Sequence, residues 1–264
     1  MPDAPVLLPW AGAHHYGVAV AVTTRHGGVS PAPYDTLNLG LHVGDDPERV
    51  QTNRERAAAA FGVDLGAMVY ARQVHGTDAV VVGPDDVGRG TRQENDAVDA
   101  ADILVTRSPA VSLVIMVADC VPLALVDPEA GVLAAVHAGW RGTAGGAVAN
   151  ALAAMVALGA RPEKVRAYLG PAVSPLRYQV NAVVRDGLAD AVGPDDLDPG
   201  VLQPDGPGHW RADLVAANAQ QLRRAGVPAG SLERAPLDTA DPALFSDRAA
   251  RPCGRFALFA RLLA

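Results

Sequence analysis

The sequence contains little of what several protein classes require. Its 264 residues include only two cysteines, Cys120 and Cys253, which excludes a disulfide framework and favours a reducing compartment. The longest apolar run, residues 109–118, is too short to span a bilayer. An early acidic residue and the lack of a basic segment argue against a signal peptide at the N-terminus. We therefore expect a soluble cytoplasmic protein with no membrane partner.

Basic charge is also scarce. The net charge is −7, and Lys164 is the only lysine among 22 basic residues. Proteins that bind nucleic acid present a basic face, so we expect no nucleic-acid partner. Because arginine replaces lysine almost everywhere, a single arginine does not by itself indicate a phosphate site. The composition is compatible with a monomer and with a homodimer.

The remaining composition is that of a globular protein, with 49% hydrophobic residues, enough for a sizeable core. Apolar, β-branched runs predict strands at 17–24, 67–74, 79–82, 102–106, 111–118, 122–126, 131–136, 165–169 and 255–263. Helical patterns occupy 47–62, 143–159, 181–192 and 211–225, and turn-rich loops occupy 25–46 and 193–210. Several strands follow one another without a helix. We therefore predict one α/β domain, residues 1–264, with layered mixed sheets sandwiched by helices in the order α-β-β-α.

Three side chains suited to metal binding or catalysis stand at the ends of predicted strands. Cys120 and His137 end two consecutive apolar runs, and His75 ends an earlier one. Lone cysteines and histidines are often core residues, but strand ends commonly face a cleft. Three such ligands would leave the fourth zinc position open, as in catalytic zinc sites. A nucleophilic Cys120–His137 pair is the alternative, and the residue pattern leaves both open.

A glycine-rich turn follows His137, in the sequence AGWRGTAGG. Thr143 is the predicted N-cap of the helix expected at 143–159. The exposed amides of Gly142 and Thr143, together with the Arg141 guanidinium, form a candidate phosphate site.

Other polar residues are weaker candidates. Asn38 lies in the glycine-rich loop and is a candidate to orient a ligand in catalysis, although turn residues of this kind are common. Arg25 and Arg54 are candidate substrate or phosphate ligands. Cys253 has no potential partner nearby in the sequence, and we interpret it as structural.

Five stretches together carry a specific resemblance. They are TRHGGVSPAPYDTLNLGLHVGDDPERVQTNR (24–54), RQVHG (72–76), DAVDAADILVT (96–106), VADCVPLALVDPEAGVLAAVHAGWRGTAGG (117–146) and LGPAVSPLRYQV (169–180). The chain resembles the polyphenol-oxidase-like, or laccase-domain, family of purine nucleoside phosphorylases with adenosine deaminase activity.

The resemblance implies a fold, a metal and a reaction. It implies one α/β domain of mixed sheets and a zinc ion held by His75, Cys120 and His137, with copper able to bind in vitro. It also implies phosphorolysis of adenosine, inosine, guanosine and methylthioadenosine to the base and a ribose 1-phosphate, and deamination of adenosine. The substrates would thus be small molecules, a purine nucleoside and phosphate.

The sequence departs from the family pattern in two places. No cysteine occurs in the stretch 170–180, and Asp238-Thr239 stands where many members have a Cys-Thr pair. Neither change touches the expected metal ligands. Both affect the expected rim of the pocket, and therefore the substrate preference.

Two other functions compete with this one. Cys120 activated by His137 would give a cysteine amidohydrolase acting on peptidoglycan precursors, and the layered fold is shared with domains that deamidate proteins with such a pair. Copper-dependent oxidation of polyphenols is the least favoured function. It requires several histidine-rich sites, whereas this chain has seven histidines and no His-x-His pair.

Overall fold

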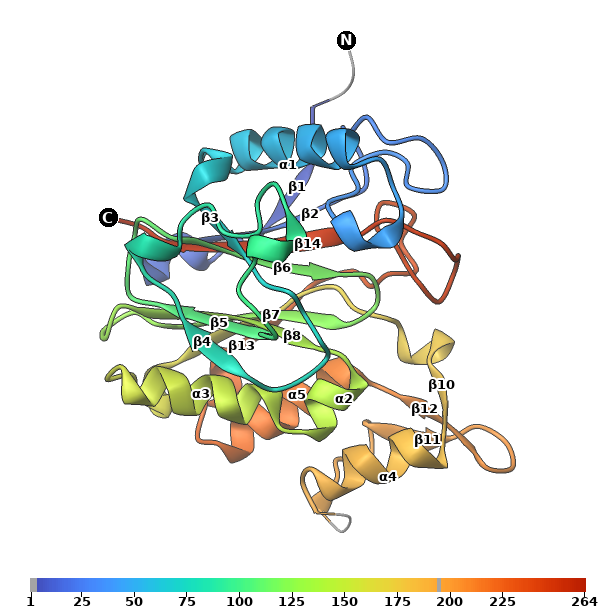
Figure 1. Cartoon of the computed structure of the whole chain (residues 1–264). Helices are drawn as coiled ribbons and strands as arrows, with labels where there is room; N and C mark the ends of the chain where they lie inside the picture. The colour runs from blue at the N-terminus through green and yellow to red at the C-terminus, as the bar shows by residue number, and fades with distance from the viewer. Residues whose placement is uncertain (1–3, 194–195) are drawn as a thin grey trace.

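Two β-sheets stack face to face at the centre of the fold, with helices on their outer surfaces (Figure 1). The computed structural model describes residues 4–193 and 196–264. The first sheet has the strand order β1-β2-β14-β6-β3, and all neighbours are antiparallel except β6 and β3. Its strands are β1 (Leu7–Pro9), β2 (Val18–Thr23), β14 (Phe256–Leu262), β6 (Ser112–Val117) and β3 (Met68–Tyr70).

The second sheet has the strand order β13-β9-β7-β8-β5-β4, with parallel pairs only at its two edges. Its strands are β13 (Leu232–Arg234), β9 (Arg166–Leu169), β7 (Val121–Asp127), β8 (Val132–Ala138), β5 (Ile103–Thr106) and β4 (Ala79–Val81). Every residue of β5, β7 and β8 is buried. These strands are covered on both faces, which explains why they are continuous apolar runs in the sequence.

The α-helices cover the two outer faces of the sheet pair. Helix α1 (Pro47–Phe61) packs on the first sheet, where Ala57 and Ala58 share a core cluster with Phe259. Helices α3 (Ala147–Ala157) and α5 (Leu214–Arg224) pack on the second sheet through a separate cluster. A third cluster fills the space between the sheets. The layers therefore run α-β-β-α, as Figure 1 shows.

A small antiparallel sheet extends from one side of these layers (Figure 1). It contains β10 (Gln179–Asn181), β12 (His209–Ala212) and β11 (Leu202–Pro204), and α4 (Ala182–Asp190) follows β10 directly. Helix α2 (Trp140–Ala144) lies between β8 and α3. Short 3-10 helices occupy Ala13–Tyr16, Leu41–Val43, Leu65–Ala67, Pro84–Asp86, Glu94–Asp96, Pro162–Lys164, Pro175–Arg177 and Ala229–Ser231.

The prediction of an α/β domain with layered mixed sheets is confirmed. Within residues 4–193 and 196–264, no helix is both long enough and apolar enough to cross a membrane. The predicted strand at 67–74 is shorter, since only 68–70 pair with β6, and Ala71 forms an isolated bridge to Val98.

Two further predicted segments differ from the structure. The helix expected at 143–159 is two helices, because Gly146 has a φ of 82°, which interrupts the helical hydrogen bonding. Its expected N-cap, Thr143, lies inside α2, which is capped by Gly139 instead. The loop expected at 193–210 contains β11 and the start of β12, a hairpin of mostly polar residues without an apolar run to signal it. Residues 194–195 of that loop lie outside the described part.

A matched pair of leucine substitutions tests the role of the core between the sheets. Leu133 is fully buried there, whereas Leu176 is 75% exposed. We expect Leu133→Ala to lower the free energy of unfolding by about 2–5 kcal/mol, because it removes buried methyl groups and leaves a cavity. Leu176→Ala should change it by less than about 0.5 kcal/mol. Urea denaturation measures both, and a similar small loss in the two variants would contradict this packing.

Candidate metal centre

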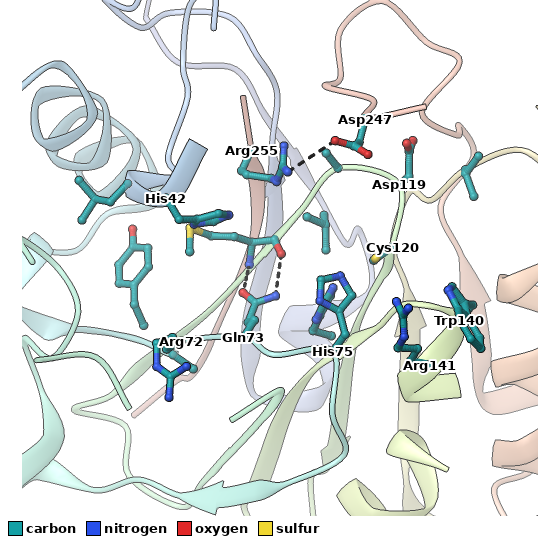
Figure 2. Close-up of a pocket in the computed structure, with 18 of the residues that line it drawn as sticks. His42, Arg72, Gln73, His75, Asp119, Cys120, Trp140, Arg141, Asp247 and Arg255 are labelled. Atoms are coloured by element: carbon teal, nitrogen blue, oxygen red, sulfur yellow. Dashed lines mark hydrogen bonds and ion pairs between the residues drawn. The ribbon is translucent and has the colours of Figure 1, made fainter. Parts of the chain in front are cut away.

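The start of β7, the end of β8 and the segment between β3 and β4 bring Cys120, His137 and His75 together. His75 was predicted to end a strand, but β3 already ends at Tyr70. Their ligand atoms all lie within 4.8 Å of one another. His137 lies near the end of β8, and its partner across the ladder is Pro122 near the start of β7. Cys120, which precedes β7, is therefore held at the same edge as His137. His75 follows β3, and its ring lies edge-on to the His137 ring at a centroid distance of 4.8 Å. Figure 2 shows the His75 ring and the Cys120 sulfur facing each other.

A buried carboxylate supports both histidines. Asp102 is fully buried, and its Oδ1 lies 2.7 Å from Nδ1 of His137. The same carboxylate accepts hydrogen bonds from the backbone N–H groups of Val74, His75 and Gly76. With Nδ1 of His137 engaged in this way, Nε2 is the nitrogen available to a metal ion.

The residue before Cys120 has an uncommon backbone conformation. Asp119 has a φ of 90°, which a residue with a Cβ rarely adopts. Its carboxylate holds a neighbouring loop, because it accepts hydrogen bonds from Thr239 Oγ1, from Ser246 Oγ at 2.7 Å and from the Arg248 N–H at 2.6 Å. Hydrogen bonds to the loop at the cavity rim thus fix the strained conformation of Asp119, the residue that precedes Cys120.

The charges of the site favour the thiolate form of Cys120. Burial alone would raise the pKa of the thiol, but the charges and hydrogen bonds of His137 and His75 lower this pKa to about 6. For His137, burial would lower the pKa, but the Cys120 thiolate and the Asp102 carboxylate outweigh it and raise the pKa to about 9. The thiolate is the form of cysteine that binds metal ions and acts as a nucleophile.

The donor set and the space around it fit a zinc ion with an open coordination position. One thiolate and two imidazoles are zinc ligands of the kind found in catalytic sites. Gly139 lies against them, and a Cβ at this position would lie 2.8 Å from the Cys120 sulfur and 3.2 Å from the His75 ring. Only glycine leaves room here for the two ligands, so we infer that the residues present fit a metal ion.

The three ligands open into a cavity of about 720 Å³. Arg141 lines it, with its guanidinium held over the Trp140 ring at 4.6 Å from the ring centroid. On another wall, the Gln73 amide bonds both backbone groups of Met116 and thereby fixes this wall to β6 (Figure 2). His42 also lines the cavity, and burial together with the nearby Arg255 charge lowers the pKa of its imidazole.

Comparison with known proteins decides the family. The pattern of the family described as "Multi-copper polyphenol oxidoreductase laccase" matches residues 19–262, nearly the whole chain. The chain belongs to this family. The resemblance inferred from the sequence motifs is therefore confirmed.

Relatives and solved structures of the family cover most of this chain. A purine nucleoside phosphorylase of Mycobacterium tuberculosis is 44% identical over 236 residues, 89% of this chain and 88% of that protein. The purine nucleoside phosphorylase YlmD of Geobacillus stearothermophilus is 40% identical over 82% of this chain and 79% of its own length. The crystal structure of YlmD matches with a TM-score of 0.90, 36% identity and coverage of 94% and 93%. The YfiH structure of Bacillus licheniformis matches with a TM-score of 0.93, 33% identity and coverage of 98% and 97%.

Of the residues predicted to bind phosphate at the turn after His137, only one lines the cavity. Arg141 lines the cavity, whereas Gly142 and Thr143 are buried in α2. The Thr143 N–H donates to the Gly139 carbonyl, and its hydroxyl accepts a hydrogen bond from Asn218, so neither group faces the cavity. The expected role of Thr143 as a helix N-cap is therefore wrong, and the phosphate-binding roles of Arg141, Gly142 and Thr143 stay predictions.

Three further predicted residues have structural contacts. The buried Arg54 lines the cavity, but its guanidinium donates to the backbone carbonyls of Leu39, Gly90 and Thr91. Asn38 and Arg25 are not among the residues that line the cavity. Asn38 is buried and bonds to Gly40, Asp45 and the Arg255 N–H, and Arg25 pairs with Asp35. The roles predicted for them in catalysis and binding stay predictions, and these contacts give each of them a structural role.

Asp102 and His42 were not predicted as site residues. Asp102 appeared only as the first residue of a predicted strand, and an acidic residue that opens a fully apolar strand is the signal that could have identified it. His42 lies in the loop 25–46, where nothing in the sequence fixes its position or distinguishes it from the other polar residues.

The two cysteines give an internal comparison for the metal centre. After zinc is removed with a chelator, iodoacetamide should alkylate Cys120. In the zinc-loaded protein, the bound metal should protect this thiolate from alkylation. Cys253 should stay unmodified in both states, because it is only 5% exposed and burial raises the pKa of its thiol. Mass spectrometry of the digested protein measures both sites. Equal labelling of Cys120 with and without zinc would contradict its role as a ligand.

Proposed function

We propose that this protein is a purine nucleoside phosphorylase, which cleaves adenosine, inosine, guanosine or methylthioadenosine with phosphate to the free base and a ribose 1-phosphate. The observation that carries the proposal is the group of His75, Cys120 and His137 at the floor of an arginine-lined cavity of about 720 Å³. Small-molecule pockets are typically about 300–1,000 Å³, so this volume suits a nucleoside and a phosphate. The relatives named purine nucleoside phosphorylase support the same reaction.

The metal that we propose is zinc, held by His75, Cys120 and His137. A zinc ion supplies Lewis-acid chemistry and lowers the pKa of water, which suits the proposed adenosine deaminase activity. The chain's part is to keep Cys120 ionised and His137 oriented through Asp102. Copper binds nitrogen and sulfur ligands more tightly than zinc does, so copper is expected to bind in vitro as well.

Arg141 is the residue that we propose for phosphate. Within the described part of the chain, its guanidinium makes no ion pair and no hydrogen bond, and its stacking on Trp140 holds it at the cavity. A guanidinium that is both positioned and unpaired can give two parallel charge-assisted hydrogen bonds to a phosphate.

His42 is a candidate contact for the nucleoside itself. Its lowered pKa keeps the imidazole neutral at neutral pH. A neutral imidazole has one donor and one acceptor nitrogen, which suits the uncharged hydroxyl and amide groups of a nucleoside.

A second candidate function has its own supporting observation. Cys120, His137 and Asp102 form a chain of thiolate, imidazole and carboxylate, as in cysteine hydrolases, which supports the amidohydrolase alternative. The convergence of His75 on the same point favours a metal ion, because a nucleophile pair has no use for a second imidazole there. Phosphorolysis therefore remains the preferred function. The cytoplasmic location and the monomeric or dimeric state stay predictions.

A product analysis separates the proposed reactions. Adenosine would be incubated with the zinc-loaded protein, with and without phosphate, and the products separated by chromatography. We expect adenine only when phosphate is present, inosine in both cases, and neither product with His75→Ala or Cys120→Ala. No turnover of adenosine by a protein that holds one zinc ion per chain would contradict the proposal.

Substitution of Arg141 tests its contact with phosphate. Because Arg141→Ala removes a charged hydrogen bond worth about 1.5–3 kcal/mol, we expect the KM for phosphate to rise about tenfold or more. The matched control is Arg107→Ala, since Arg107 is exposed and lies outside the cavity lining. Initial rates at varied phosphate measure both variants. An unchanged KM for phosphate in Arg141→Ala would exclude this role.

A further inference from the structure

One buried carboxylate meets four hydrogen-bond donors from the two segments that carry the histidine ligands. The side chain of Asp102, which is 0% exposed, lies 2.7 Å from Nδ1 of His137. It also accepts the backbone N–H of Val74 at 3.1 Å, of His75 at 3.0 Å and of Gly76 at 2.7 Å. No other residue in the described part of the chain bonds to both of these segments through its side chain.

We propose that Asp102 is the positioning residue of the metal centre, and that it sets both histidine ligands at once. It would set His137 through the imidazole ring and His75 through the backbone. This inference rests on the metal centre of the proposed function, and it concerns the affinity and geometry of metal binding rather than the reaction.

The contact with His137 fixes which ring nitrogen is the ligand. Because a carboxylate can only accept, Nδ1 of His137 carries the hydrogen and Nε2 presents its lone pair to the metal side. The backbone repeats the contact, since the His137 N–H donates to the Asp102 carbonyl at 2.8 Å. Asp102 therefore restrains both the rotation of the ring and the position of its strand.

The contact with His75 acts on the main chain. His75 has a φ of 60°, in the left-handed region that is unfavourable for a residue with a Cβ. The three N–H groups of residues 74–76 converge on the Asp102 carboxylate and hold the turn in this conformation. Without that acceptor, the turn would relax toward a more common conformation, and the exposed His75 ring would leave the metal position.

Asp102→Asn is the smallest change that breaks this arrangement. An amide of the same size has one oxygen to accept hydrogen bonds and an NH₂ group that can only donate. The site presents four hydrogen-bond donors to this side chain. The amide nitrogen of Asn would face groups that also donate, so hydrogen bonds to His137 or to residues 74–76 would be lost. Loss of such outer contacts typically weakens metal binding about 10- to 100-fold.

Asp127, at the end of β7 in the same sheet, provides a matched control. It is also 0% exposed, and its carboxylate accepts three backbone N–H groups, from Glu129 at 2.9 Å, Ala130 at 3.1 Å and Arg161 at 2.8 Å. It contacts none of the metal ligands. Asp127→Asn therefore imposes a similar structural loss on the same sheet, and only a positioning role makes the two variants differ in metal binding.

The test is a zinc titration of the full-length protein after removal of metal, in competition with a chromophoric chelator. Wild type, Asp102→Asn and Asp127→Asn would be compared, together with their melting temperatures and the visible spectra of their cobalt forms. We expect the zinc Kd to rise about 10- to 100-fold in Asp102→Asn, with an altered cobalt spectrum. Asp127→Asn should lower the melting temperature but keep the wild-type zinc Kd and spectrum.

Three outcomes would overturn the inference in distinguishable ways. A wild-type zinc Kd in Asp102→Asn would exclude the positioning role and leave the metal centre intact. An equal rise of the zinc Kd in Asp102→Asn and Asp127→Asn would mean that Asp102 has only a structural role. Zinc binding that is the same in wild type and Cys120→Ala would overturn the metal centre itself, and the inference with it.

A measurement on the wild type covers the case in which Asp102→Asn does not fold. Nitrogen-15 NMR of the zinc-loaded protein reports which imidazole nitrogens carry hydrogen and which bind metal. We expect His137 to carry its hydrogen on Nδ1 and to bind zinc through Nε2. Zinc bound at Nδ1 of His137 would overturn the inference, because that nitrogen would no longer donate to Asp102.

Discussion

The register of three buried strands is the constraint on which the candidate site depends. In the ladder between β7 and β8, Pro122 pairs with His137, and in the ladder between β8 and β5, Val136 pairs with Ile103. Cys120 and Asp102 each lie just before their strand, so both are carried to the edge where β8 ends. A shift of one residue in either ladder would turn the inward side chains to the opposite face and separate the group. The apolar packing on both faces of these strands fixes the register.

Two parts of the site lie outside these ladders, and hydrogen bonds to carboxylates hold them in place. His75 and Asp119, both with positive φ, lie on connecting segments, and each takes part in a carboxylate-centred group of hydrogen bonds. Asp102 joins the turn of His75 to β8, and Asp119 joins Cys120 to the loop around Ser246. The strained backbone at His75 and Asp119 and the buried carboxylate of Asp102 therefore lie together around the metal ligands. This distribution is typical of a functional site.

The sequence predicted those parts of the fold and site that depend on local patterns. The apolar runs predicted the central strands, and their polar ends singled out Cys120, His137 and His75. The break in the helix after β8 was not predicted, because the helical pattern continues through Gly146 and the positive φ of that residue shows only in the structure. With that break, Thr143 became a buried residue of α2 instead of a cap.

The remaining site residues could not be predicted from the sequence, because their roles depend on tertiary contacts. The role of Asp102 depends on residues 74–76 and His137, which are distant in sequence, so no local pattern could indicate it. In the same way, the position of Asn38 in a glycine-rich loop favoured a ligand-orienting role. In the structure, its side-chain amide instead bonds to Asp45 and to the Arg255 N–H. Polar residues in long loops are the least predictable, since their partners are set by the packing of the whole domain.

Anomalous X-ray diffraction at the zinc absorption edge, on crystals of the purified protein, tests the central claim most directly. We expect one strong anomalous peak per chain, bonded to the Cys120 sulfur and to the His75 and His137 rings. A zinc-loaded crystal without a peak at this position, or with Cys120 outside bonding distance of it, would exclude this metal centre and favour a free cysteine nucleophile.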